Sequence, residues 1–274
     1  MNANLTYIEA LSYIEAVSFV APGLQDWRQT RSVLRGESAY QPAELATYQP
    51  NLLPPNERRR ASPTVRMAFR IAEELVKSSS IPADQLASVF SSSDGDLAIA
   101  QRICAALAES SRMVSPTDFH NSVHNAAAGY WSIAANAKGP STAVSAFDQS
   151  FAVGLLEAYG MVQVEQRPTL LIVYDVPAPA PLQTSRPVTT PVGMGLLITS
   201  QPTTNTIAGM RLTIESGHEN GMQHSELETL RISNPAARAL PLLHSLATSF
   251  ESVGVAYDDG RSVKCTLQSH GARS

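Results

Sequence analysis

The sequence predicts an α/β fold in which a mixed, largely parallel sheet is covered by helices on both faces. Segments typical of strands alternate along the chain with segments of helical periodicity. The run TLLIVYDV at 169–176 is apolar throughout, which is typical of a strand buried on both faces. No strong linker interrupts this pattern, so we expect residues 1–274 to form a single domain.

Each element has its own local justification. Ser62 can cap a helix whose first turn accepts Pro63, and apolar residues recur on one face of that helix. The Pro-rich stretch 41–55 predicts a surface loop. We expect 192–200 and 208–216 to be antiparallel neighbours. The predicted strands are 14–20, 86–91, 142–147, 169–176, 192–200, 208–216 and 261–269. The predicted helices are 24–36, 62–80, 97–107, 122–139, 149–163 and 234–250.

Composition excludes several function classes. The net charge is −4 and basic residues are scattered, so we predict no nucleic-acid role. No stretch reaches 18 consecutive apolar residues, and the start of the chain lacks the pattern of a signal peptide. We therefore expect a cytoplasmic protein without a membrane span. Cys104 and Cys265 lie far apart without a CxxC pair, so we expect both to be core residues.

The common catalytic motifs are absent. The sequence holds no GxSxG, GxxxxGK[ST] or HExxH pattern. His120 and His124 have the four-residue spacing of two metal ligands on a helix, but no acidic or cysteine partner stands at a fixed spacing beside them. We therefore predict neither a metal site nor another cofactor.

Asp148 is the most informative single position. It stands where the β-rich run 142–147 passes into the apolar helical run that follows. A carboxylate there can cap the helix and benefits from the helix dipole. The same position would lower the pKa of a cysteine thiol and activate it as a nucleophile. A carboxylate cannot replace that thiol usefully, because its attack on a thioester would give a mixed anhydride more reactive than the substrate.

Several motifs resemble the β-ketoacyl synthase family. VSPTDFHNSVHNAAAGYWSIAANAKGPSTAVSAFDQS at 114–150 is similar to the segment that leads to the family's acyl-accepting cysteine, which falls on Asp148. ERRRASPTVRMAFRIAEE at 57–74 and SSSDGDLAIAQ at 91–101 are similar to two earlier family segments. The resemblance covers about residues 10–200 and implies the N-terminal half of a thiolase-like fold. Residues 201–274 are then an abbreviated set of strands and a helix.

The sequence departs from the family's catalytic pattern in two ways. The cysteine is missing, with Gln149 beside the degenerate position, and no counterpart of the family's two catalytic histidines follows residue 200. The resemblance is therefore to short, cysteine-less chain-length factors, as in bacterial aryl polyene type II polyketide systems. It implies a non-catalytic subunit that forms a heterodimer, or a dimer of heterodimers, with an active β-ketoacyl synthase and works with an acyl carrier protein.

The resemblance also implies roles for particular residues. The strand before Asp148 is expected to pair with the partner, and two further segments are expected to wall the acyl tunnel. The implied tunnel and interface residues are Leu97, Ile99, Ala100, Ile103, Asp118, Phe119, His120, Thr142, Val144, Ala146 and Phe147. Two alternatives remain open: an independent acyl-thioester hydrolase or decarboxylase that uses Asp148 with His120 or His124, and a scaffold that binds carrier protein through Arg58–Arg60.

Overall fold

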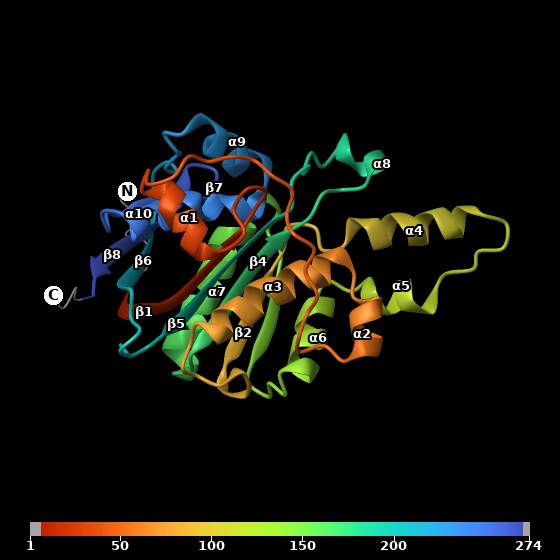
Figure 1. The fold of residues 1–274 in the computed structure, drawn as a ribbon, viewed down its shortest axis with the longest axis horizontal. Coiled ribbons are helices and arrows are strands. Elements are labelled where there is room, and N and C mark those ends of the chain that lie inside the picture. The colour runs from red at the N-terminus through yellow and green to blue at the C-terminus, as the bar shows by residue number, and fades with distance from the viewer. Residues whose placement is uncertain (1–6, 271–274) are drawn as a thin grey trace, which may run out of the picture.

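A computed structural model describes residues 7–270, which build one mixed sheet flanked by helices (Figure 1). Its strands are β1 (Tyr7–Val20), β2 (Ala87–Ser91), β3 (Ser141–Val144), β4 (Thr169–Asp175), β5 (Val192–Thr199), β6 (Ala208–Ser216), β7 (Val253–Asp258) and β8 (Arg261–Ser269). Their order across the sheet is β3-β2-β4-β5-β1-β6-β8-β7.

The helices are interspersed with the strands along the chain. They are α1 (Trp27–Leu34), α2 (Pro55–Arg60), α3 (Pro63–Lys77), α4 (Leu97–Ala108), α5 (Pro116–Asn121), α6 (Ala126–Ala134), α7 (Ser150–Glu165), α8 (Ala180–Gln183), α9 (Ser225–Ser233) and α10 (Leu240–Ala247). Short 3₁₀ helices are η1 (Ala83–Gln85), η2 (Phe147–Gln149) and η3 (Pro235–Ala239). The predicted helix at 234–250 is thus divided into η3 and α10.

The pairing of the strands confirms a mixed α/β sheet. It corrects one predicted pair of neighbouring strands. Strand β2 pairs in parallel with both β3 and β4, whereas the other pairings in the described sheet are antiparallel. Parallel pairing is therefore confined to the three strands at the β3 end. The prediction that 192–200 and 208–216 are neighbours is wrong, because β1 lies between β5 and β6 and pairs with both.

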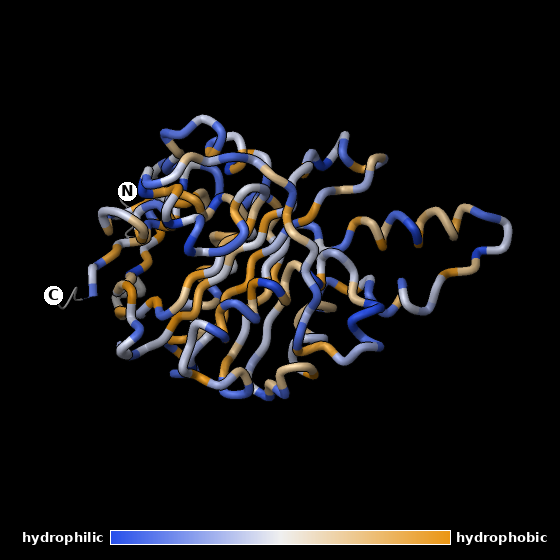
Figure 2. Tube along the Cα trace, viewed as in Figure 1, coloured by the Kyte–Doolittle hydropathy of each residue, from blue (hydrophilic) through white to orange (hydrophobic). Residues whose placement is uncertain are grey.

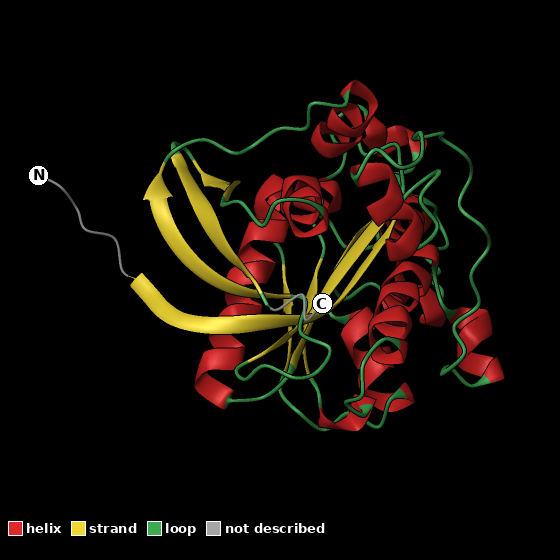
Figure 3. Ribbon diagram, turned by 60° about the vertical axis from the view of Figure 1, so that its left-hand side comes forward, coloured by secondary structure: helices red, strands yellow, loops and turns green. Residues whose placement is uncertain are grey.

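Strand β1 pairs with β5 along one part of its length and with β6 along another, because it is longer than predicted and bends. Its register shifts between Ile14 and Ala16, and the sheet curves strongly toward the beginning of β1 (Figure 3). Glu15 lies at the shift and is buried, and its carboxylate accepts hydrogen bonds from the hydroxyls of Thr199, Thr203 and Thr206. These bonds tie the turn between β5 and β6 to the bend and satisfy an otherwise costly buried charge.

Two hydrophobic cores lie on opposite faces of the sheet. Alternate residues of β4 enter different cores: Leu171 and Val173 share one core with residues of α7, whereas Leu170 and Ile172 share the other with residues of α3 and α6. All seven residues of β4 are buried. The prediction of a strand covered on both faces is therefore confirmed.

Helix α7 lies unusually close to the sheet. A Cβ atom on Gly154 would come within 2.8 Å of the Cβ of Ser91 on β2, so only glycine fits this contact without a shift. The other side of α7 contacts β7 and η3 from the C-terminal part of the chain. Residues beyond 201 therefore extend the sheet and help to bury a helix that is apolar around most of its circumference.

The remaining local predictions have mixed outcomes. The Oγ of Ser62 accepts a hydrogen bond from the backbone of Val65, which confirms the predicted cap of α3. Cys265 is buried as predicted, but Cys104 is exposed on α4, so its assignment to the core is wrong. Helix α4 projects from the body and leaves most of its surface uncovered (Figure 1). Within residues 7–270, no helix is both long and apolar enough to cross a membrane.

Candidate functional site

A tight turn containing Asp148 follows the edge strand β3. Phe147 has a φ of 52°, and α7 begins at Ser150. The Oγ of Ser150 accepts a hydrogen bond from the N–H of Ala146 at 3.0 Å and donates one to the carbonyl of Phe147 at 2.7 Å. The predicted meeting of a strand end and a helix N-terminus at Asp148 is therefore present, with a left-handed residue in the turn.

Asp148 makes an ion pair instead of capping α7. Its Oδ1 accepts a hydrogen bond from Nη1 of Arg186 at 2.6 Å. The residue at the N-cap of α7 is Gln149, and its side chain makes no capping bond. The predicted capping role of Asp148 is therefore wrong. The physical reason is that η2 intervenes and moves the start of α7 to Ser150, while a buried guanidinium offers a stronger, charge-assisted partner.

The ion pair belongs to a larger polar network beneath the turn. Nε of Arg186 also donates to Asp94, and the Oγ of Ser93 lies 2.7 Å from Asp94 and 2.8 Å from Asp175. Burial alone would lower the pKa of Arg186, but its hydrogen bonds to Asp94 and Asp148 outweigh this effect and raise it. The side chain of Arg186 is only 9% exposed, so its charge is balanced inside the protein by two carboxylates.

Asp175 is fully buried at the end of β4. Its Oδ1 accepts hydrogen bonds from the hydroxyls of Ser92 and Ser93 and from the N–H of Ser93, whereas its Oδ2 has no hydrogen-bond partner within residues 7–270. Burial raises the pKa of Asp175 to about 7, although these bonds oppose the rise.

Sequence reasoning missed Arg186, Asp94 and Asp175. Asp94 and Asp175 could have been found from the sequence, because the carboxyl ends of adjacent parallel strands meet at one edge of a sheet. Asp94 follows β2 and Asp175 ends β4, which are parallel neighbours. Arg186 had no such signal, since it lies in the loop between β4 and β5 and reaches the turn only through the fold.

The two candidate histidines have different surroundings. The ring of His120 on α5 packs edge to face against Tyr130, with ring centroids 6.1 Å apart. Nε2 of His124, before α6, lies 3.0 Å from the carbonyl oxygen of Ser92. Within residues 7–270, no hydrogen bond joins either histidine to Asp148. No group of three potential metal ligands is clustered within residues 7–270.

Helices α4 and α5 form a projecting arm, defined here as residues 97–121. Arg102 on α4 makes two hydrogen bonds to Asp118 on α5, at 3.0 and 2.7 Å, and these hold the arm together. Asp118, predicted as a polar contact at the interface, thus has a partner within its own chain. Figure 2 shows that hydrophobic residues continue onto the projecting α4.

The arm leaves some of the residues that the resemblance implied as tunnel walls exposed and covers others. Ile99 is buried at its base, Leu97 and Ile103 are half-buried, and Ala100 is exposed. Phe119 is 71% exposed. Six of the nine exposed large hydrophobic residues in the described chain lie between positions 107 and 147, on or near the arm and β3. They are Leu107, Met113, Phe119, Val123, Ile133 and Phe147.

Strand β3 forms one edge of the sheet. Within the described sheet it pairs with β2 alone, so its other side presents backbone groups without a strand partner there. Thr142, Val144 and Ala146 are half-buried, and Phe147 is 56% exposed. An open edge flanked by exposed apolar residues is a template for pairing with another strand.

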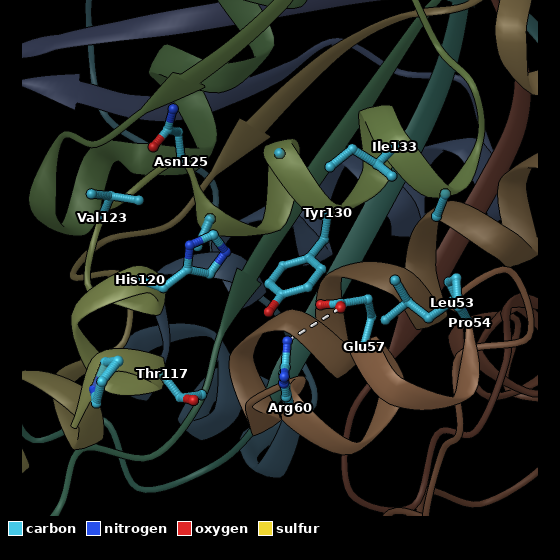
Figure 4. A pocket seen from close by; sticks show the side chains of 14 residues that line it. Leu53, Pro54, Glu57, Arg60, Thr117, His120, Val123, Asn125, Tyr130 and Ile133 are labelled. Carbon is cyan, nitrogen blue, oxygen red and sulfur yellow. Dashed lines mark hydrogen bonds and ion pairs between the residues drawn. The ribbon is translucent and has the colours of Figure 1, made fainter.

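An open groove of about 700 Å³ lies between α2, α5 and α6. Figure 4 shows the hydroxyl of Tyr130 pointing toward Arg60 and Glu57, with His120 beside the ring and Ile133 on α6. Among the described residues, the buried Tyr130 hydroxyl has no hydrogen bond of ordinary geometry, although its interaction with the Asn121 side chain opposes the rise of its pKa on burial. The groove has a mainly apolar lining with a few polar groups at one end.

The arginine cluster at 58–60 is largely engaged within the chain. Arg58 donates to the carbonyls of Asn51 and Leu53 and so fixes the Pro-rich loop. Arg60 pairs with Glu57 at 3.5 Å. These contacts give the cluster an internal structural role.

Comparison with known proteins gives matches of two kinds. The model of the β-ketoacyl synthase N-terminal domain matches residues 26–258. Among solved structures, a chain from the ketosynthase ApeO in complex with its chain length factor ApeC from Xenorhabdus doucetiae is 23% identical. That alignment covers 94% of this chain and 100% of that chain, with a TM-score of 0.71. No curated protein sequence matches the chain.

Two further solved structures show the same fold. A chain of the ishigamide ketosynthase/chain length factor is 14% identical, with coverage of 96% and 100% and a TM-score of 0.71. A chain from AntDE:AntF, a type II acyl-carrier protein in complex with its ketosynthase, is 10% identical, with coverage of 95% and 99% and a TM-score of 0.73. The predicted thiolase-like ketosynthase fold is confirmed, and the chain belongs to the β-ketoacyl synthase family, whose N-terminal domain it matches over residues 26–258.

Proposed function

We propose that the chain is a chain-length-factor subunit that makes no covalent bond to substrate and acts as a heterodimer with an active β-ketoacyl synthase. The observation that carries the proposal is the concentration of six exposed large hydrophobic residues between 107 and 147, a segment that includes most of the projecting arm and the open edge strand β3. Isolated exposed apolar residues are normal, but a gathering of this kind marks an interaction site. The solved structures with the same fold include ketosynthase/chain length factor complexes, which supports this choice of partner.

The chemistry of the turn supports a non-catalytic role. The family's nucleophile position holds Asp148, and its carboxylate is engaged with Arg186. A carboxylate in an ion pair is a poor nucleophile and a poor general base, because the guanidinium of Arg186 occupies its oxygen. The catalytic cysteine and both histidines would then come from the partner. The alternative of an independent hydrolase needs Asp148 beside a histidine, and no hydrogen bond between described residues provides that contact.

The arm and the strand have distinct parts in the proposal. Strand β3, with Thr142 and Val144, pairs with the partner's sheet and hides the open edge. The arm, with Phe119 and His120 on α5 and Ala100 on α4, reaches toward the partner and walls an acyl or polyene tunnel. An acyl carrier protein delivers the substrate, docking mainly on the active partner.

Co-expression with a ketosynthase that carries its cysteine and both histidines tests the proposal. We expect a 1:1 complex by size-exclusion chromatography with light scattering, and aggregation of the chain expressed alone. Phe119→Ser should weaken the complex at least ten-fold. The matched control is Ile232→Ser, which changes an equally apolar, exposed residue on α9, away from the arm.

The alternatives predict different results. A chain that stays soluble and monomeric alone and turns over acyl thioesters would support the independent enzyme. Equal effects of Phe119→Ser and Ile232→Ser on complex formation would exclude the arm as the binding surface. Retained carrier-protein binding by the chain without a ketosynthase, lost on substitution of Arg59, would support the scaffold.

A further inference from the structure

Phe147 combines two features that are costly for an aromatic residue. Its φ of 52° lies in the left-handed region, which side chains with a Cβ atom rarely adopt. The residue is also 56% exposed, just beyond the end of an open edge strand. Backbone strain of this kind persists only where the surrounding structure imposes it, and it concentrates at functional positions.

The conformation of Phe147 is imposed from two sides. Within the turn, Ser150 bonds to the N–H of Ala146 and to the carbonyl of Phe147. Above the ring, the guanidinium of Arg186 lies 3.8 Å from the ring centroid, as in a close cation–π contact. One face of the ring is therefore covered by a cation, while the residue as a whole stays more than half exposed.

Arg186 is itself rigidly held. Its ion pairs to Asp94 and Asp148 arise from the loop after β2 and from the turn after β3. Because the side chain is 9% exposed and fixed at two of its nitrogens, it has little freedom to move. The planar guanidinium can satisfy both carboxylates and stack on the ring at once, which an ammonium group cannot do.

We propose that Arg186 is a positioning residue that fixes the ring of Phe147 as an apolar anchor for the partner ketosynthase. This inference rests on the proposed function and extends it to one contact. Phe147 follows the last residue of β3 by three positions, so its ring continues the edge at which the partner strand pairs. Interfaces depend on a few aromatic anchors, and an anchor held in its bound conformation loses less entropy on association.

The network of ion pairs also gives Asp148 a role in positioning the ring of Phe147. Asp148 and Asp94 hold the guanidinium, and the guanidinium holds the ring, so both carboxylates act on the interface through Arg186. The position of the family's nucleophile thus serves to orient a neighbouring side chain. The exposed surface of the ring then fits an apolar pocket on the partner, next to the partner's own edge strand.

A double-mutant cycle on the co-expressed complex tests the proposal. The variants are Phe147→Ala, Arg186→Lys and the double variant, and the readout is the rate of subunit exchange, followed by native mass spectrometry with an isotopically labelled chain. Arg186→Lys keeps a positive charge between the carboxylates but removes the planar stack. We expect about ten-fold faster exchange for each single variant and no further acceleration when Arg186→Lys is added to Phe147→Ala.

A second variant protects the test against misfolding. Phe147→Gly removes the ring and accepts the left-handed conformation without strain, so it should fold even if Phe147→Ala does not. It should exchange as fast as Phe147→Ala. Ile232→Ser serves as the control that leaves exchange unchanged.

Three results would overturn the inference, and the first two leave the proposed function standing. One is exchange at the wild-type rate in Phe147→Gly. Another is an equal acceleration by Arg186→Lys with and without the ring, which would show that Arg186 only stabilises the fold. The third is the absence of any wild-type complex with the ketosynthase, which would remove the proposed function as well.

Discussion

Replacing Asp175 with asparagine should change how stability depends on pH. Burial raises the pKa of this carboxyl group from 3.8 to about 7, a shift of about three units. Each unit corresponds to about 1.4 kcal/mol, so ionising Asp175 in the folded state costs at most about 4 kcal/mol. The asparagine side chain would still offer an oxygen to the donors of Ser92 and Ser93, but it cannot ionise.

The sign of the effect follows from the direction of the shift. Because the folded-state pKa of Asp175 is higher than that of the unfolded chain, its stabilising contribution is complete below about pH 4. That contribution is lost as the pH rises through about 7. The free energy of unfolding of the wild type should therefore fall relative to that of Asp175→Asn between pH 4 and 8, by up to about 4 kcal/mol.

Pulse proteolysis in urea measures this difference at sub-micromolar protein, where an exposed apolar arm causes little self-association. Wild type and Asp175→Asn are compared at pH 5, 6, 7 and 8. Asp84→Asn is the control, since Asp84 is exposed at the surface. Parallel pH curves for the wild type and Asp175→Asn would refute the reasoning, because they would mean that Asp175 ionises equally in the folded and unfolded chain.

Three further substitutions have defined outcomes. Ser62→Ala removes the cap of α3 and should lower the free energy of unfolding by about 1 kcal/mol in urea titrations. Gly154→Ala places a Cβ atom 2.8 Å from β2 and should lower the melting temperature, whereas Gly160→Ala, which meets nothing within 4 Å on the same helix, should leave it equal or higher. In the reconstituted complex, Ala100→Phe should shorten the products seen by mass spectrometry without dissociating the subunits. Ala108→Phe at the far end of α4 is its control, and unchanged product length in an intact Ala100→Phe complex would count against the tunnel assignment.

Local patterns predicted much of the fold, because they depend on residues close in sequence. The cap at Ser62 and the doubly covered strand β4 follow from such patterns, and both are present. The neighbours of β1 could not be predicted, since its length and bend depend on Glu15 meeting threonines about 190 residues away. Contacts between residues so far apart in the chain leave no pattern in the local sequence from which they could be predicted.

The candidate site also has a part that local patterns predicted and a part that depends on long-range contacts. The sequence located the turn at Asp148, because a strand-to-helix junction is visible as a change of periodicity. It assigned the carboxylate to the wrong partner, since Arg186 approaches from a loop 38 residues later. The exposure of Cys104 was missed for a related reason: α4 has the apolar composition of a core helix but projects from the body. The apolar composition of a helix does not show whether the rest of its own chain covers it.

The location of the acyl group in the assembled complex tests the central claim most directly. The co-purified pair is incubated with an acyl-loaded carrier protein, and the intact mass of each subunit is measured. The account predicts an acyl adduct on the ketosynthase subunit alone, with the mass of the present chain unchanged. A covalent acyl group on this chain, purified without any partner, would contradict it.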